Sequence, residues 1–221
     1  CVCDSQVRDC VKIMEMNFPV YYAGIRPLDS KGRGVVIEYD VPGHCGEVLV
    51  NPGDLMKAAS VTKIAKEIDK KYGRCDILEN NAGLNILERQ WAKLTPANAE
   101  QVIDGNLSSA FYCTTAVLPM MRKKKDGVLI HTSSMAGRNP SLLSGPAYSA
   151  AKHGVVAMSH TINQEECVNG IRSSVVLPGE VATPILDKRP VPITPAERKR
   201  MAQSEDVGDL IRYVACLPAH I

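Results

Sequence analysis

The chain has 221 residues, 45% of them hydrophobic, which is enough for one domain with a sizeable core. Its 26 basic and 24 acidic side chains nearly balance, and the compact basic run at residues 122–125 falls where a helix should end. No apolar stretch approaches the roughly 18 residues of a membrane span. We therefore expect neither a nucleic-acid partner nor a membrane-spanning segment.

Short apolar runs alternate with amphipathic segments from residue 46 onward, which is typical of a βαβ chain. Strands are expected at residues 35–41, 47–50, 75–79, 127–132 and 171–177. Helices are expected at residues 59–72, 97–122, 147–168 and 204–216, with a proline-rich loop at 180–195. Pro119 should end or kink the second helix. Glu79 interrupts an otherwise apolar strand, and the pattern offers no reason for it.

The eight cysteines are scattered and form no C-x-x-C pair, and no pair of histidines shares metal-ligand spacing with a nearby cysteine or carboxylate. No metal site is therefore expected. Cys75 and Cys113 lie within apolar segments and should be small buried side chains. A reducing, cytoplasmic setting fits this cysteine usage best.

A tyrosine and a lysine stand four residues apart in the helix expected at residues 147–168. Tyr148 and Lys152 should project from one helix face, with about 5–6 Å between their Cβ atoms. An ammonium beside a phenol favours the phenolate, so Lys152 is predicted to lower the pKa of Tyr148 from about 10. Tyr148 would then serve as a proton donor for carbonyl reduction near neutral pH.

Further motifs stand directly after expected strands: Asn80-Asn81-Ala82-Gly83, Ser133-Ser134 and Pro178-Gly179. With Asp54, Asn106 and the Tyr148–Lys152 pair, they resemble the short-chain dehydrogenase/reductase family, where such motifs occur in this order. The similarity runs from about Gly53 to the C-terminus. The resemblance implies an α/β, Rossmann-like fold, with a doubly wound parallel sheet in three αβα layers. It also implies an oxidoreductase that uses NAD or NADP to interconvert a small carbonyl compound and an alcohol.

The resemblance assigns roles to the catalytic candidates. Ser134 polarises the substrate carbonyl, and Tyr148 acts as general acid and base. Lys152 lowers the pKa of Tyr148 and holds the cofactor ribose, while Asn106 anchors a water in a proton relay. Ser133 is the alternative candidate for the serine that meets the substrate. Successive strand residues face opposite sides, so only one of the two can do so, and the spacing to Tyr148 favours Ser134.

The cofactor contacts are implied in the same way. Gly179 should leave room for the nicotinamide ring, because it has no Cβ. Asp54 matches the residue that caps the adenine amino group. The full set of expected contacts is Asp54, Leu55, Asn81, Ala82, Gly83, Tyr148, Lys152, Pro178, Gly179, Val181 and Thr183. Trp91, the only tryptophan, should lie close enough to report cofactor binding by its fluorescence.

Residues 1–46 depart from the family pattern. A nucleotide-binding domain of this kind opens with a strand, a glycine-rich turn and a helix that receives the pyrophosphate. The family motif T-G-x-x-x-G-x-G is absent. We therefore divide one domain into an atypical segment, 1–46, expected to be truncated, replaced or misassembled, and a family-like part, 47–221. The missing turn predicts weak NAD(P) binding and leaves open a catalytically impaired binding or scaffold protein.

Self-association is also expected from the resemblance, which implies that the helices at 97–122 and 147–168 pair around a two-fold axis in a homodimer or homotetramer. Phe111, Val117, Val155 and Met158 are more apolar side chains than one covered helix face should need.

Overall fold

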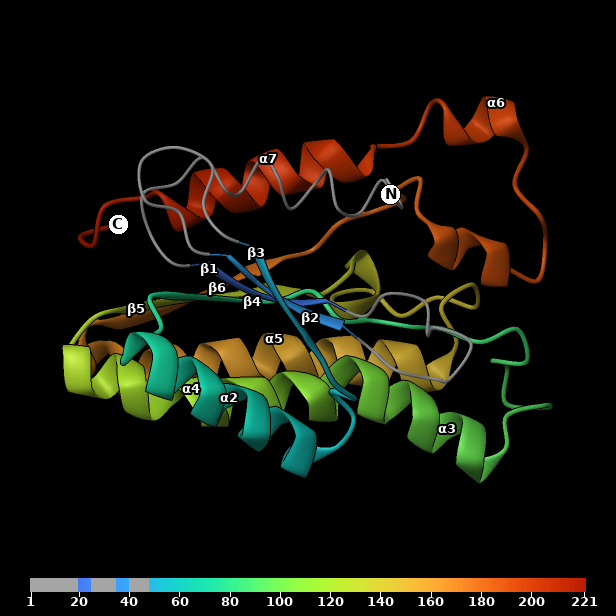
Figure 1. The fold of residues 1–221 in the computed structure, drawn as a ribbon. Coiled ribbons are helices and arrows are strands. Elements are labelled where there is room, and N and C mark those ends of the chain that lie inside the picture. The colour runs from blue at the N-terminus through green and yellow to red at the C-terminus, as the bar shows by residue number, and fades with distance from the viewer. Residues whose placement is uncertain (1–19, 25–34, 40–47) are drawn as a thin grey trace.

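A six-stranded sheet forms the centre of the molecule in the computed structural model, which describes residues 20–24, 35–39 and 48–221 (Figure 1). For residues 20–24, 35–39 and 48–52, the backbone alone is described. The strands follow the order β3-β2-β1-β4-β5-β6 across the sheet. Their bounds are β1 Val20–Gly24, β2 Val35–Tyr39, β3 Val48–Pro52, β4 Ile77–Asn80, β5 Gly127–Thr132 and β6 Ile171–Val176.

Strand direction is mixed at one edge of the sheet. β1, β4, β5 and β6 are parallel to one another, whereas β2 runs antiparallel to both β1 and β3. The predicted parallel sheet is thus correct apart from β2. Parallel neighbours need a crossover of about a dozen residues or more, but the segment 25–34 between β1 and β2 has only ten. The segment 40–47 between β2 and β3 is shorter still. Antiparallel neighbours can be joined by such short segments, which accounts for the reversed direction of β2.

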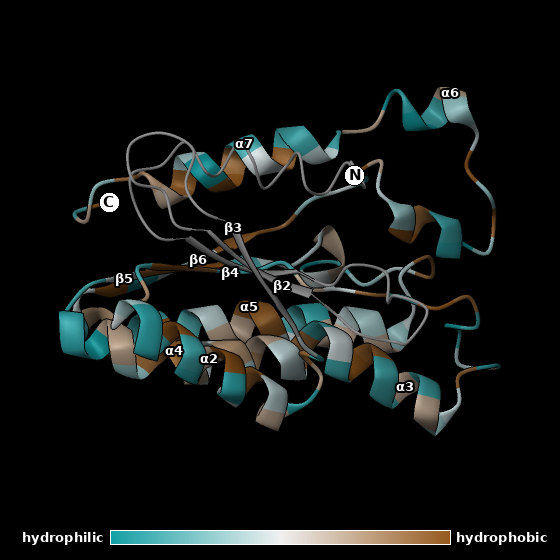
Figure 2. Cartoon of the chain, in the orientation of Figure 1, coloured by the Kyte–Doolittle hydropathy of each residue, from teal (hydrophilic) through white to brown (hydrophobic). Residues whose placement is uncertain are grey.

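Helices cover both faces of the sheet, which confirms the predicted three-layer arrangement (Figure 1). One face carries α2 (Ala58–Tyr72), α3 (Pro96–Ile103), α4 (Ser109–Lys124) and α5 (Pro146–Glu166), and the other carries α7 (Ser204–Ala215). Figure 2 shows both hydrophobic and hydrophilic residues along α2 and α7, as expected for helices with one buried face.

Two hydrophobic clusters join these layers. The larger one lies on the side of α2, α4 and α5 and includes Ile64, Met121, Leu129 and Ile162. The smaller one joins strand residues such as Ile130 to Ile211 on α7. Leu129 belongs to the larger cluster and its neighbour Ile130 to the smaller one. β5 is therefore buried on both faces, as its apolar sequence predicts.

The helix expected at residues 97–122 is interrupted, but not at Pro119. α3 and α4 are separated by one π-helical turn, η1 (Asp104–Ser108), and α4 continues past Pro119 to Lys124. The proline ring lies on the exposed side of α4, where it disturbs no core packing. The π-turn instead accompanies the buried Asn106, whose Nδ2 donates to the Val102 carbonyl at 2.7 Å.

Several boundaries differ from expectation. β3 ends at Pro52, two residues beyond the strand expected at residues 47–50. The loop expected at residues 180–195 contains a 3-10 helix, η4 (Pro184–Lys188), and ends at a short helix, α6 (Pro195–Arg198). α5 passes into a 3-10 turn, η3 (Cys167–Asn169), and stops at Gly170, whose φ of 70° lies in the left-handed region that glycine tolerates.

The argument for self-association from apolar helix residues is wrong in part. Val117, Val155 and Met158 are buried within the single chain, at 4%, 2% and 4% exposure, because α4 and α5 pack against the sheet and their neighbours. Phe111 is 45% exposed. One side chain of that group is therefore left for a contact with another copy.

Cys75 and Cys113 are buried as expected, and burial raises the pKa of the Cys113 thiol to about 12. Over the residues that the structure describes, none of the helices combines the length and apolar character that crossing a membrane requires.

Candidate active site

A cavity of about 920 Å³ opens where the loops after β4, β5 and β6 meet the start of α5. Its wall includes most of the residues singled out from the sequence, namely Asn81, Gly83, Ser134, Tyr148, Lys152, Pro178, Gly179, Val181 and Thr183. Because the carboxyl ends of parallel strands meet at one edge of a sheet, motifs far apart in the chain converge there.

Backbone hydrogen bonds hold the loops after β5 and β6 together. Ser133 donates its N–H to the Val176 carbonyl at 2.8 Å, and Met135 donates its N–H to the Pro178 carbonyl at 2.9 Å. Ser134 lies between these two bonds. Its position relative to Pro178 and the following Gly179 is therefore set by the main chain, independently of any ligand.

The two neighbouring serines have different surroundings. The Ser133 hydroxyl is buried and donates to the Lys152 carbonyl at 2.8 Å, which ties the end of β5 to α5. The Ser134 hydroxyl is a hydrogen-bond partner of the Tyr148 phenol, and its oxygen also accepts from the Ala136 N–H at 3.1 Å. Ser134 is thus the serine placed beside the tyrosine, and Ser133 is part of the scaffold.

Lys152 lies beneath the tyrosine in the cavity wall. Its ammonium is 5.6 Å from the centre of the Tyr148 ring and donates to the Thr132 carbonyl at 2.8 Å. The side chain is only 3% exposed, and burial lowers the pKa of Lys152 to about 8. The predicted proximity of the two side chains is therefore confirmed.

The predicted lowering of the Tyr148 pKa by Lys152 is wrong in this structure. Burial of the phenol raises the pKa of Tyr148 above its ordinary value. The Ser134 hydrogen bond and the positive charge of Arg89 act in the opposite direction without outweighing burial. The physical reason is that loss of water around the phenolate dominates, as it does for weakly paired buried acids.

Asn106 does not line the cavity but lies directly behind its wall. It is 1% exposed, its amide donates to the Leu84 carbonyl at 2.8 Å, and its Oδ1 accepts from the Leu84 N–H at 3.2 Å. A Cβ added to Gly83 would stand 3.0 Å from Asn106 Oδ1 and 3.3 Å from Lys152 Nζ. Asn106 thus fixes the loop after β4 close to the lysine.

Three expected cofactor contacts are not brought to this cavity. Asp54 turns back on its own loop, where it accepts from the Met56 N–H at 3.0 Å. Leu55 and Ala82 belong to the hydrophobic core, at 2% and 8% exposure. Trp91, the expected fluorescent reporter, is 80% exposed and also lies outside the cavity wall.

The nicotinamide end of a dinucleotide fits the residues that are present. No atom lies within 4 Å of where a Gly179 Cβ would stand, so a flat ring can approach the backbone there. Lys152 donates one hydrogen bond to the described chain, which leaves ammonium protons for ribose hydroxyls. The phosphate end, which was expected to lack its glycine-rich turn, falls on residues 1–46, largely outside the described part of the chain.

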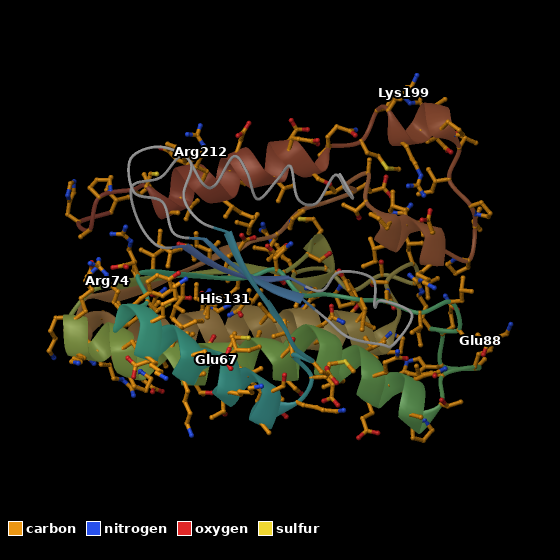
Figure 3. The ribbon with its side chains drawn as sticks, viewed as in Figure 1. Glu67, Arg74, Glu88, His131, Lys199 and Arg212 are labelled. Carbon is orange, nitrogen blue, oxygen red and sulfur yellow. The ribbon has the colours of Figure 1, made fainter. Side chains whose placement is uncertain are left out.

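Sequence reasoning assigned no role to three charged or titratable groups in or near the site. Arg89 and Glu79 both line the cavity, although neither belongs to a recognised motif. His131 lies at the heart of the molecule on β5 (Figure 3), with Nδ1 3.0 Å from the Asn80 amide nitrogen. Burial and the Lys152 charge lower the pKa of His131 to about 4, so it is neutral at neutral pH.

Metal ligation has no evident site in the described ranges, since they contain no cluster of three or more His, Cys, Asp or Glu side chains able to hold an ion. The cavity wall itself carries a hydroxyl, a phenol and an ammonium, those of Ser134, Tyr148 and Lys152.

Comparison with known proteins agrees with this geometry. The family model for short chain dehydrogenases matches residues 20–191. A 3-oxoacyl-[acyl-carrier-protein] reductase of Synechocystis sp. is 33% identical over 209 residues, which cover 87% of this chain and 83% of the relative. A D-beta-hydroxybutyrate dehydrogenase of Rhizobium meliloti is 32% identical, but the match covers 65% of this chain and only 55% of that protein.

Among solved structures, a metagenomic short-chain oxidoreductase in complex with NADP superimposes with a TM-score of 0.63 at 26% identity, covering 76% of this chain and 67% of that one. Fold, motifs and relatives therefore lead to one conclusion: the chain belongs to the short-chain dehydrogenase family of NAD(P)-dependent oxidoreductases.

Proposed function

We propose that this chain interconverts a small carbonyl compound and its alcohol, with NAD or NADP as the redox partner. The relatives named above are a reductase and a dehydrogenase, which favours an enzyme over a silent scaffold.

Each side chain has a task that its surroundings support. Ser134 donates a hydrogen bond to the substrate oxygen and orients it, and Tyr148 moves a proton to or from that oxygen. When bound, the nicotinamide supplies or accepts the hydride. Because burial keeps the Tyr148 phenol protonated, the tyrosine stands ready as the proton donor in the reductive direction.

Lys152 and Asn106 serve the same site from behind. The Lys152 ammonium, anchored on the Thr132 carbonyl, holds the ribose hydroxyls and carries protons towards the phenol. The Asn106 side chain is committed to Val102 and Leu84, so it contributes by holding the loop after β4 in place. Any water in the proton relay would have to be bound beside that side chain rather than by its amide protons.

The test is NADH and NADPH oxidation by the purified chain with a panel of aldehydes and ketones. Tyr148→Phe should retain the fold and cofactor affinity and lose about 10²–10⁴-fold in turnover, as is typical for a general acid. Tyr213→Phe is the matched control, since Tyr213 lies on α7 and is 65% exposed. A Tyr148→Phe variant with more than about a tenth of the wild-type rate would contradict the role.

The cellular setting and assembly state are also proposals. Free Cys75, Cys113, Cys167 and Cys216 support a reducing, cytoplasmic setting. A homodimer or homotetramer through α4 and α5 is supported by the exposed Phe111 on α4. Sedimentation velocity at micromolar concentration tests the assembly, and a clean monomer would refute it.

A further inference from the structure

Arg89 carries a buried positive charge in the cavity wall. The residue is 5% exposed, and its guanidinium donates to three carbonyls from separate segments of the chain. Nε donates to Ile86 at 2.6 Å, Nη1 donates to Leu143 at 3.1 Å, and Nη2 donates to Lys188. Arg89 therefore joins the loop after β4, the segment before α5 and the end of η4 around the cavity.

All of these acceptors are neutral. Within the described residues, Arg89 forms no ion pair with a carboxylate, although buried charges in proteins are usually paired. A second cation, Arg189, directly follows Lys188, whose carbonyl Arg89 binds, and burial and then the Arg189 charge lower the pKa of Arg89. Two like charges held near each other in a cavity wall favour an anion between them.

The positive charge of Arg189 is only partly neutralised by its ion-pair partner. Arg189 also lines the cavity, its side chain is 17% exposed, and it donates to Glu180 at 2.6 Å. The Glu180 side chain is 54% exposed, so its charge is shared with solvent. Lys188 also lines this wall, but it is exposed, so its charge is likewise shared with solvent. Positive charge thus exceeds negative charge at this end of the cavity.

This cationic end adjoins the reacting groups. The positive charge of Arg89 acts on the Tyr148 phenol and offsets part of the rise in pKa that burial causes there. Gly145, next to the start of α5, has a φ of 77°, and a Cβ there would stand 2.7 Å from the Arg89 carbonyl oxygen. The arginine loop is thus closely packed against the segment that leads to Tyr148, and the position of its charge relative to the phenol is fixed.

We infer that Arg89 and Arg189 form a carboxylate subsite, and that the substrate is a short oxo acid whose carboxylate lies a few bonds from the reacting carbonyl. The inference rests on the proposed function. In the reductive direction the carbonyl carbon gains the hydride and its oxygen gains the proton of Tyr148. The products are the hydroxy acid and the oxidised cofactor, and the carboxylate is unchanged throughout.

The experiment compares matched acids and esters with the purified full chain. The probes are 2-oxobutanoate and 3-oxobutanoate, each beside its methyl ester, with NADH or NADPH as reductant. Charge-assisted bonds from two guanidinium groups should give the better acid about 100-fold higher kcat/KM than its ester. Equal kcat/KM values for acids and esters would overturn the inference while leaving the proposed function intact.

Single substitutions test which side chains cause the preference for acids over esters. Arg189→Gln should lower kcat/KM for the acid by about 10–100-fold and leave kcat/KM for the ester and the Kd for NADPH unchanged. Glu180→Gln removes the partner of Arg189 but keeps the cation, so the acid should be reduced at least as well as before. Lys199→Gln is a neutral control, because Lys199 is exposed at α6 and lies outside the cavity wall (Figure 3).

Two outcomes separate the possible failures. If Arg189→Gln weakens NADPH binding and spares the acid-over-ester preference, the cation serves a cofactor phosphate and the substrate inference is wrong. If neither acids, esters nor neutral ketones are reduced, the proposed function itself fails. Arg89→Lys gives a second variant with the charge retained but without the three-carbonyl geometry, and it should lower kcat/KM for the acid more than for the ester.

Discussion

The free energy of unfolding of Lys152→Met, relative to the wild-type protein, should depend on pH. Lys152 is 3% exposed, and burial lowers its pKa to about 8 from an ordinary value of 10.5. Below pH 8, the folded wild-type protein carries a buried ammonium and bears the whole cost of removing it from water. Methionine fills a similar volume with an apolar, flexible side chain and carries no charge.

The magnitude follows from the lowered pKa. At 1.36 kcal/mol for each unit of pKa, the lowering from 10.5 to about 8 corresponds to about 3 kcal/mol. Between pH 8 and 10.5 the unfolded chain binds a proton that the folded chain has lost, so the stability of the wild-type protein rises with pH in that window. The variant has no such group. The wild type should therefore gain about 2–3 kcal/mol over Lys152→Met between pH 7 and pH 10.

Urea denaturation followed by circular dichroism at pH 7, 8, 9 and 10 measures this difference. Using the difference between two proteins cancels the titration of every other group. Lys123→Met, at an exposed position of α4, is the matched control and should show no such change. A wild-type minus Lys152→Met difference that stays constant from pH 7 to pH 10 would refute the reasoning. Turnover by Lys152→Met should be lost at every pH, because the ammonium that we propose holds the cofactor ribose is gone.

Two further substitutions test separate parts of the structure. Gly179→Ala should leave stability unchanged, because its Cβ meets no atom within 4 Å, and should weaken NADPH binding about tenfold in a fluorescence titration. Glu166→Gln should cost about 1 kcal/mol in urea denaturation, because Glu166 is the buried carboxylate partner of a half-exposed Arg122, whereas Glu165→Gln, at an exposed position, should cost nothing measurable. Equal stability of these two glutamine variants would count against the ion pair.

Features that depend on residues close together in the chain were predicted correctly. The strand expected at residues 127–132 matches β5 residue for residue, because its apolar run is buried on both faces. The four-residue spacing of Tyr148 and Lys152 correctly placed both on one helix face. The sign of the Tyr148 pKa shift was missed, because burial depends on what packs over the helix and not on the helix itself.

Long-range contacts explain most of the remaining misses. The π-turn at residues 104–108 goes with hydrogen bonds between Asn106 and Leu84, which lies 22 residues away in the chain. Arg89 depends on Leu143 and Lys188, at separations of 54 and 99 residues, so no pattern around residue 89 could indicate its position. Which apolar helix residues are covered within the single chain is likewise a property of packing, as Val155 shows.

The reversed strand β2 leaves the half of the sheet that borders the cavity unaffected. In open α/β sheets, ligands bind outside the carboxyl ends of the strands, where the strand order reverses. In this sheet that point lies between β1 and β4, which are parallel neighbours, and Asn81 follows directly after β4. β5 and β6 continue in the same direction and carry Ser134 and Gly179 to the same edge. Since β2 lies on the other side of β1, its reversal changes the strand connections there without moving the groups that surround Tyr148.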